Sequence, residues 1–215
     1  MRISIESDVK RLSATLNRAQ RTQIPFAISK TLNQIAYQVA KETMPKKADQ
    51  TFAGGATPFT KRGFKYVKST KNKLWATVFI DKDQAKYMKF MVQGGTRFPE
   101  KRAILVSTKQ SRLNKYGNIP RGTLQKMIDD RSKFFKGTPK GKPNAPAGIW
   151  ERYGRKGRSS SAGQKIRLVA LYTSEAQYKP LFPFGEFTEG VVFSRRDGFA
   201  LKFQKNLADA LRTAR

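Results

Sequence analysis

Apolar residues recur at helical spacing in the first part of the chain. Residues 2–5 alternate as a short strand would, and an apolar stripe at helical spacing follows over residues 9–19. A broader apolar face covers residues 26–40, with Pro25 in its first turn and Pro45 at its end. The pattern predicts a short strand followed by two helices, or by one helix that breaks just before Pro25.

The next part of the chain alternates apolar and polar residues. Residues 46–60 are rich in Gly and Pro and predict a loop. Residues 61–69 and 73–81 predict the two strands of a β-hairpin that turns at residues 70–72. Residues 84–92 carry apolar positions that fit either a helix or a strand.

Residues 103–107 predict one more strand, after which the composition changes. Residues 109–164 are polar, basic and rich in Gly and Pro, with two ordered pieces, a helix over 124–135 and a short segment at 149–153. Between residues 109 and 158, 14 Lys and Arg residues accompany only 3 acidic residues. Part of this region is therefore predicted to be an exposed basic arm or long loop.

The last part of the chain returns to regular elements. Residues 165–173 alternate and predict a strand, and residues 178–184 are aromatic, rich in Pro and extended. A C-terminal helix is predicted from about residue 188. Its apolar stripe comprises Phe199, Phe203, Leu207, Ala210 and Leu211.

The order of these elements indicates the α+β class. We expect an antiparallel sheet packed against N-terminal helices and a C-terminal helix, with a basic extended insertion. The predicted organisation is a single domain. Its core comprises residues 1–108 and 165–215, and residues 109–164 form the insertion.

The charge balance indicates an anionic partner. The 215 residues include 44 Lys and Arg against 15 Asp and Glu, which gives a net charge of +29. Such a chain repels itself when compact, and phosphate backbones are the common partner because bound cations release condensed counterions. A generally basic protein that binds nucleic acid only incidentally is the alternative. A membrane partner is not expected, since no segment reaches ~20 apolar residues and no N-terminal signal peptide is evident.

Missing residue types argue against catalysis. The chain has no Cys and no His, which removes disulfides, thiolate chemistry, Cys/His zinc sites and histidine acid–base chemistry. It also lacks a P-loop and a Gly-x-Ser-x-Gly elbow. We therefore expect a protein that is not an enzyme, with no cofactor and no metal.

Two tight acidic pairs are the only candidates for metal chemistry. Asp81 and Asp83 follow a predicted strand, where they could hold Mg²⁺ in a nuclease or simply cap a turn. Asp129 and Asp130 are adjacent on a predicted helix and therefore point in different directions. We expect turn capping for the first pair and charge compensation for the second.

Basic and aromatic residues are interleaved in three places, at residues 64–68, 133–136 and 150–155. These aromatics could stack on bases or pack in the core. Cations in Gly-rich loops have no such packing role, so they are the better candidates for phosphate contacts. No signature of sequence-specific readout is present. The predicted electrostatic contacts are Arg112, Lys115, Arg121, Lys136, Lys140, Lys142, Arg155, Lys156 and Arg158.

Several segments occur in an order that resembles the tail-completion proteins of long-tailed bacteriophages. Residues 24–43 (IPFAISKTLNQIAYQVAKET) resemble the N-terminal helix of minor tail protein Z of lambda-like phages. Gly148–Tyr153 (GIWERY), Leu168–Tyr172 (LVALY) and Tyr178–Phe184 (YKPLFPF) then follow, before the C-terminal helix. The resemblance covers roughly half of the chain.

The resemblance implies a structural role in the virion, at the tail or neck, for a protein made in the host cytoplasm. The implied task is tail completion and head–tail joining. Its implied partners are the tail terminator, tail tube or connector and the DNA end in the channel. A tail tube has six-fold symmetry, so a hexameric ring is expected.

Two other functions stay open at this stage. The chain could be a free, non-sequence-specific nucleic-acid-binding protein, such as a nucleoid protein or RNA chaperone. It could also be a metal-dependent nuclease that uses Asp81 and Asp83.

Overall fold

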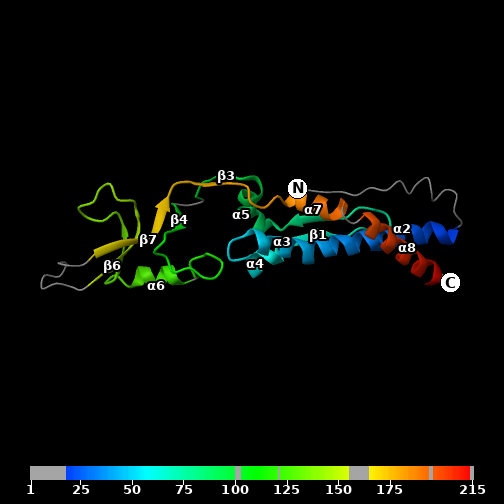
Figure 1. Ribbon diagram of the computed structural model, residues 1–215, viewed down its shortest axis with the longest axis horizontal. Coiled ribbons are helices and arrows are strands. Elements are labelled where there is room, and N and C mark those ends of the chain that lie inside the picture. Colours follow the sequence, from blue (N-terminus) through cyan, green and yellow to red (C-terminus); the bar gives the residue numbers. More distant parts are fainter. Residues whose placement is uncertain (1–17, 100–102, 121, 155–164, 194–195, 214–215) are drawn as a thin grey trace. The chain divides into compact units, whose positions relative to one another are not determined.

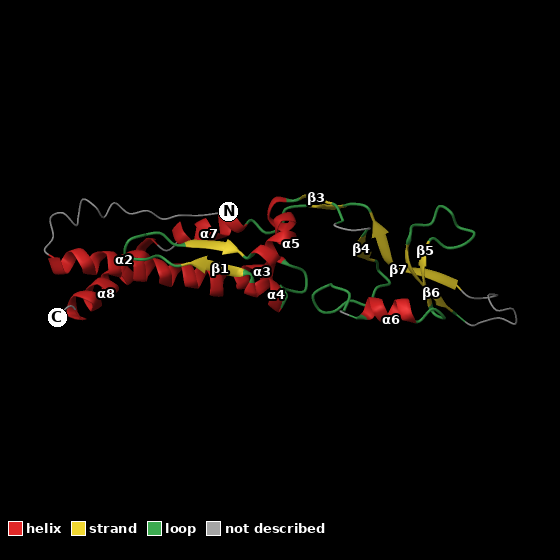
Figure 2. Ribbon diagram, turned by 180° about the vertical axis from the view of Figure 1, so that it is seen from behind, coloured by secondary structure: helices red, strands yellow, loops and turns green. Residues whose placement is uncertain are grey.

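The computed structural model describes residues 18–99, 103–120, 122–154, 165–193 and 196–213 (Figure 1). These residues form helices and antiparallel strands (Figure 2), which confirms the predicted α+β class with N-terminal helices and a C-terminal helix. The predicted strand at residues 2–5 and most of the helix predicted after it lie outside the described residues.

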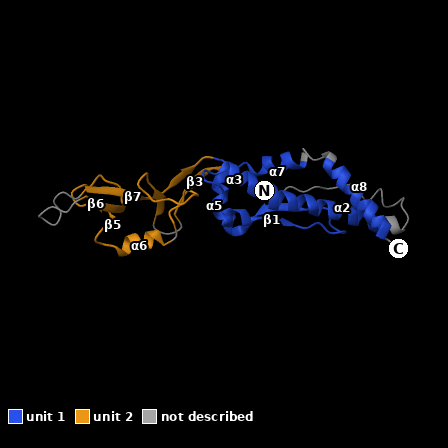
Figure 3. Cartoon of the chain, turned by 60° about the horizontal axis from the view of Figure 1, so that its bottom comes forward, with its two compact units in different colours: residues 1–93, 180–215 blue, residues 94–179 orange. Residues whose placement is uncertain are grey.

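The chain divides into two compact units (Figure 3). Unit 1 comprises residues 1–93 and 180–215, and unit 2 comprises residues 94–179. The predicted boundaries differ, because the strands flanking the basic segment belong to unit 2 rather than to the core of unit 1. Those strands pair with each other and with strands inside the segment, so the segment carries its own sheet.

Unit 1 contains one long helical segment. Helix α2 (Arg18–Gln38) passes Pro25 without ending. A π-helical turn, η1 (Val39–Thr43), then leads directly into α3 (Met44–Thr51). The predicted break before Pro25 and the predicted helix end at Pro45 are therefore wrong.

The π-turn explains how the helix continues past Pro45. The N–H of Met44 bonds the carbonyl of Val39, five residues earlier, in place of the usual four. Proline has no N–H and its ring clashes with the carbonyl four residues before it, and a wider turn relieves that clash. Pro45 then occupies the first turn of α3, where proline is tolerated.

Residues 46–60, predicted as a loop, contain much of α3 and the start of α4 (Pro58–Arg62). Thr57 caps α4, because its hydroxyl accepts a hydrogen bond from the Thr60 N–H at 3.1 Å. Only residues 52–57 are irregular. Helix signals in this stretch were masked in the sequence by its Gly and Pro content.

The predicted hairpin is confirmed, with shorter strands than expected. Strand β1 (Phe64–Val67) pairs antiparallel with β2 (Thr77–Ile80). Thr70 and Lys73 close the turn through reciprocal backbone hydrogen bonds of 2.9 and 3.1 Å. The Ser69 carbonyl accepts hydrogen bonds from the side chains of Ser29 and Asn33, both at 3.0 Å, which attach the hairpin to α2.

Three more helices complete the described part of unit 1. Residues 84–92 lie in α5 (Lys82–Gln93), which ends at Gly94 with a positive φ of 72°. The C-terminal helix predicted from about residue 188 starts earlier and consists of α7 (Phe184–Phe193) and α8 (Arg196–Thr213).

The core of unit 1 gathers on the apolar face of the long helical segment. Phe64 of β1 and Phe182 are fully buried, with ring centroids 5.8 Å apart. Helix α8 packs along α2 through a buried polar contact, in which Asn206 donates to the Thr31 hydroxyl at 2.9 Å. Both of these side chains are buried and satisfied, so the contact sets the register of α8 on α2.

Unit 2 contains a four-stranded antiparallel sheet. Its strand order is β4 (Ile104–Ser107), β7 (Lys165–Thr173), β6 (Gly148–Tyr153) and β5 (Phe134–Gly137). The strands predicted at 103–107 and 165–173 are thereby confirmed. A separate ribbon pairs β3 (Gly95–Arg97) with β8 (Ala176–Tyr178).

The helix predicted over residues 124–135 covers two elements. Helix α6 (Thr123–Asp129) ends before Asp130, whose carboxylate accepts hydrogen bonds from the Ser132 hydroxyl and the Lys133 N–H. The side-chain hydrogen bonds of this turn compete with the backbone hydrogen bonds that would extend the helix. The chain then enters β5, where Phe135 lies opposite Trp150 with the rings stacked 6.4 Å apart. Cross-strand packing of that kind outweighs helix periodicity over a few residues.

Gly148 allows the close approach of β6 and β7 beside a bulge. The register shifts between Ile149 and Trp150, so that β7 has one extra residue there. A Cβ at Gly148 would lie 2.2 Å from the carbonyl oxygen of Ala170 and 2.6 Å from a methyl group of Leu168. A backbone oxygen cannot move away as a flexible side chain can, so only glycine fits.

Gly148→Ala should therefore destabilise unit 2 by about 2 kcal/mol or more. Urea denaturation followed by Trp150 fluorescence, in a Trp75→Phe background, measures the change. Gly190→Ala in α7 of unit 1 is the control, followed through Trp75 in a Trp150→Phe background, because nothing lies within 4 Å of its added Cβ. That control should raise stability slightly, as alanine does in a helix. Equal effects of the two substitutions would contradict the packing argument.

Candidate nucleic-acid interface

The basic loop after β4 is anchored and ordered in its described residues. The hydroxyls of Thr108 and Ser111 both donate to the carbonyl of Val169, at the bulge of β7. Further along, the Asn114 side chain accepts hydrogen bonds from the N–H groups of Tyr116 and Asn118, at 2.9 and 3.1 Å. This arrangement is an Asx-turn, and it holds Lys115 at an exposed turn.

The second basic loop joins β5 to β6 and also consists of hydrogen-bonded turns. The N–H of Lys142 bonds the carbonyl of Pro139 at 3.1 Å, and Gly141 supplies the positive φ of 77° at the third position of that turn. Pro139 is buried, while Lys140 and Lys142 are exposed. The turns therefore present both ammonium groups to solvent from a defined backbone.

The structure distributes the predicted phosphate contacts over both edges of the sheet. Arg112 and Lys115 follow the edge strand β4, whereas Lys136, Lys140 and Lys142 belong to the opposite edge strand β5 and the loop after it. All five side chains are exposed. The other four predicted contacts, Arg121, Arg155, Lys156 and Arg158, lie outside the described residues.

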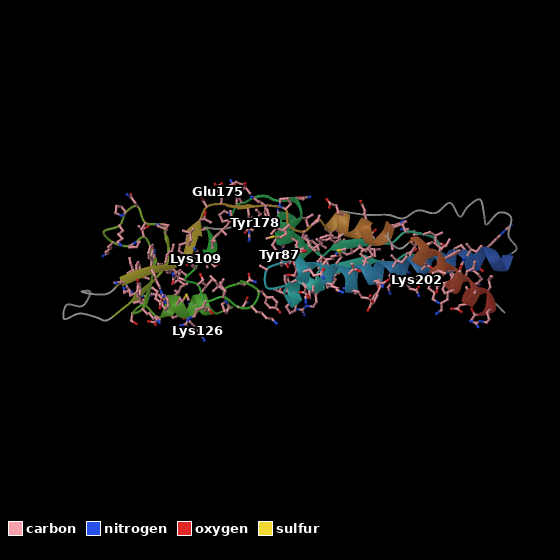
Figure 4. The ribbon with its side chains drawn as sticks, viewed as in Figure 1. Tyr87, Lys109, Lys126, Glu175, Tyr178 and Lys202 are labelled. Atoms are coloured by element: carbon pink, nitrogen blue, oxygen red, sulfur yellow. The ribbon has the colours of Figure 1, made fainter. Side chains whose placement is uncertain are left out.

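Further exposed cations belong to the same unit, although the sequence patterns did not single them out. Lys109 lies in the turn after β4 and Lys126 on α6 (Figure 4). The full sequence of unit 2 holds 20 Lys and Arg against 5 Asp and Glu. The sequence patterns missed Lys109 and Lys126 because composition gives the number of cations but not the element on which each one lies.

One buried carboxylate accounts for both ion pairs of unit 2 in the part of the chain that is described. Glu151 on β6 is 7% exposed and bonds Arg167 at 2.7 Å and Lys133 at 3.3 Å. Arg167 also donates to Gln110 at 3.3 Å, which links the carboxylate to the loop after β4. Among the described residues, the other cations of unit 2 have no carboxylate within 4 Å. The exposed ones among them, including Arg112, Lys115, Lys136, Lys140 and Lys142, can therefore meet an external anion.

The environment of Glu151 lowers its pKa. Burial raises the pKa of this carboxyl, but the hydrogen bonds and charges of Arg167 and Lys133 outweigh burial, so the pKa lies below its ordinary value. The carboxylate stays charged near neutral pH. Its single negative charge then lies between two cations of a strongly basic unit and offsets part of their charge.

The aromatic residues that alternate with cations in the sequence contact other protein groups in the structure. Phe64 is fully buried and Trp150 is 9% exposed, so neither offers a free face to a base. Phe135 is covered by the Arg152 guanidinium, 4.6 Å from its ring centroid. Tyr153 is 40% exposed, but Arg167 lies 5.3 Å from its ring. These rings are therefore engaged within the protein rather than free to stack on bases.

The two acidic pairs act locally. Asp81 forms an ion pair with Lys65 and accepts a hydrogen bond from the Lys82 N–H. Both interactions lower the pKa of the Asp81 carboxyl. Asp83 pairs with Lys86 at 3.1 Å. Within the described residues no group of three or more potential metal-ligating side chains occurs. The turn-capping interpretation of Asp81 thus agrees with its contacts.

Comparison of the chain with family models, with curated proteins and with solved structures gave no match. In the described part of the chain, none of the helices combines the length and apolar character needed to span a membrane.

Glu151→Gln should reduce the stability of unit 2 by about 2 kcal/mol at pH 7, since a charged hydrogen-bond partner is lost. Because the folded-state pKa is depressed, the wild-type advantage should be complete above pH 4.5, the ordinary value of this carboxyl, and disappear as the pH falls through the folded-state pKa. Urea denaturation across this pH range measures it. Asp129→Asn is the exposed control, and a pH-independent difference for Glu151→Gln would refute the ion-pair explanation.

Proposed function

We propose that this chain is a structural protein of a phage tail or neck, acting in tail completion and head–tail joining. It contacts DNA, or acidic surfaces of neighbouring ring proteins, through the basic surface of unit 2. The proposal assigns it no catalytic step. The observation that carries it is the set of exposed cations on ordered turns that have no carboxylate partner among the described residues.

The charge supports contact with a phosphate backbone rather than with a small anion. The cations lie on both edges of the sheet and on α6, so a single small ligand could not neutralise them together. A polymer with a regular charge along its length can. Contacts of this kind are independent of base sequence, which suits the end of any genome.

The order of sequence segments supports the tail assignment. The residues that resemble minor tail protein Z form the C-terminal part of α2, from Ile24 onward, and the η1 turn. The other resembling segments lie in β6, in β7 and in the stretch from β8 to the start of α7. This support comes from the sequence resemblance alone. The structure adds only the elements in which the resembling segments lie.

A six-fold ring on the particle is part of the proposal. Six copies, each with a net charge of +29, would repel one another strongly. DNA in the channel or acidic neighbours would offset that repulsion. We therefore propose a monomer in isolation and a ring, joined by heterologous contacts, in the assembled virion.

A free nucleic-acid-binding protein is the second candidate. The exposed cations favour it to the same degree, because phosphate contacts require no ring. The two functions differ in location, since the second one needs no particle.

Replacing the five described candidate cations with glutamine should weaken binding to duplex DNA at least about tenfold at about 0.15 M salt, and the slope of log K against log salt should become shallower by up to about 4. Fluorescence anisotropy against salt measures both. A matched control removes five exposed cations of unit 1: Lys46, Arg62, Lys71, Lys73 and Lys82. Equal losses for the two variants would contradict a localised surface on unit 2.

The location of the chain tests the tail assignment. In a particle structure, or by antibody labelling of purified particles, the chain should appear at the head–tail junction. Reversing the five cations to glutamate should abolish infectious particles, while circular dichroism of the isolated protein stays unchanged. Normal infectious particles would refute the role of this surface, and absence from particles would favour the free nucleic-acid-binding protein.

A further inference from the structure

A groove of about 980 Å³ lies in unit 1 between α2 and α8. Helix α2 and η1 form one wall, and the other elements are α8 and the end of β1 with Lys68. Lys30, Lys68, Lys202 and Lys205 line it. Lys202 on α8 is labelled in Figure 4. The groove belongs entirely to unit 1 and is separate from the basic surface of unit 2.

The floor of the groove is a fixed polar network. Asn206 donates from its amide nitrogen to the Thr31 hydroxyl at 2.9 Å and to the Gln34 carbonyl oxygen at 3.0 Å. Lys202 donates to the carbonyl oxygen of Gln38 at 3.0 Å. Thr31 is fully buried and Asn206 is 4% exposed, so the network is part of the helix packing. The groove is therefore preorganised rather than formed by mobile surface groups.

This network orients two amide donors. Because the oxygens of Gln34 and Gln38 accept the bonds from α8, their NH₂ groups remain as donors, and neither has an acceptor among the described residues. Both side chains line the groove. Such donors suit the carbonyl groups of a bound peptide backbone.

The charges of the groove select an anionic ligand. Four lysines line it, and none has a carboxylate within 4 Å among the described residues. Two carboxylates, Glu42 and Asp209, share the groove. Arg212 already pairs with Asp209 at 2.7 Å. A positive surplus therefore remains over the walls.

The same carboxylates disfavour a nucleic-acid strand. A phosphodiester chain carries a negative charge at every nucleotide, so it would meet Glu42 and Asp209 with repulsion. A peptide can place a neutral residue at those points and acidic residues opposite the lysines. The groove also offers an aromatic surface, because Tyr37 is 50% exposed and packs edge-to-face against Tyr66, 6.2 Å away. An apolar side chain of a peptide fits that surface.

We propose that this groove binds an acidic peptide segment of a neighbouring protein. Carboxylates of the segment pair with the four lysines, its backbone accepts hydrogen bonds from Gln34 and Gln38, and an apolar residue packs on Tyr37. The inference concerns unit 1 alone and does not rest on the proposed function. A polymer of phosphates on unit 2 and an acidic peptide on unit 1 are separate ligands.

The test uses the full chain and a short labelled peptide in which glutamate alternates with leucine or alanine. Fluorescence anisotropy measures peptide binding at about 0.15 M salt, because salt at this concentration screens non-specific attraction between exposed charges. Lys30→Gln combined with Lys205→Gln should weaken peptide binding about tenfold, since each lost ion pair at a preorganised site weakens binding about threefold. Binding to duplex DNA should stay within about twofold of the wild type. Neither lysine holds a side-chain hydrogen bond within the described residues, so the fold should persist, as circular dichroism would verify.

The matched control is Lys46→Gln combined with Lys82→Gln, which removes two exposed lysines of unit 1 outside the groove. This control should bind the peptide as the wild type does. Equal weakening by both variants, or unchanged binding by the groove variant, would overturn the proposal. Loss of DNA binding in the groove variant would instead assign the groove to nucleic acid and also overturn it. The glutamine substitutions in unit 2 leave the groove intact, so failure of the DNA surface is distinguishable from failure of this site.

Discussion

The buried apolar face of the helical segment from α2 through α3 is the constraint on which unit 1 depends. The hairpin contacts it through Phe64, the segment before α7 through Phe182, and α8 packs along its first half. The π-turn keeps this face continuous past Pro45, since Val39 and Met44 on either side are both almost fully buried. A helix that ended at Pro45 would remove Ala48 of α3, which is fully buried, from this core. The groove between α2 and α8 has its floor on the same segment, so its shape follows from the packing.

Unit 2 has to tolerate a large positive surplus with a small core. Its buried apolar cluster has few members, including Ile149 and Val169, and the buried carboxylate of Glu151 holds two cations beside them. Among the described residues, Lys109, Lys115, Lys140 and Lys142 lie on turns that face solvent, where repulsion between charges is screened. The two candidate surfaces of the molecule thus differ in chemistry. Unit 2 presents exposed cations on turns, whereas the groove of unit 1 combines lysines with carboxylates, amides and tyrosines.

The sequence was informative where one periodicity dominated a segment. The strand at 165–173 and the hairpin were found because their side chains alternate without interruption, and the α+β class followed from the order of elements. The sequence was misleading where the local preference of a residue disagrees with the packing that the residue finds in the folded chain. Pro45 indicates a helix end by its local chemistry, although packing against the rest of unit 1 favours continuation. Phe134 and Phe135 fitted a helix, although Trp150 and Glu151 on the neighbouring strand give them better partners in a sheet.

The sequence by itself determined the net charge, the absence of Cys and His, the class of fold and the basic character of residues 109–158. These properties depend on composition and local periodicity, which need no knowledge of distant contacts. Only the tertiary structure decided that the basic segment has its own sheet, that its cations occupy both edges of that sheet, and that Glu151 meets Arg167. It alone brought Asn206 to Thr31 and created the groove between α2 and α8. Those features require residues far apart in the chain to meet, and the free energy that selects such contacts comes from burial and hydrogen bonding across elements.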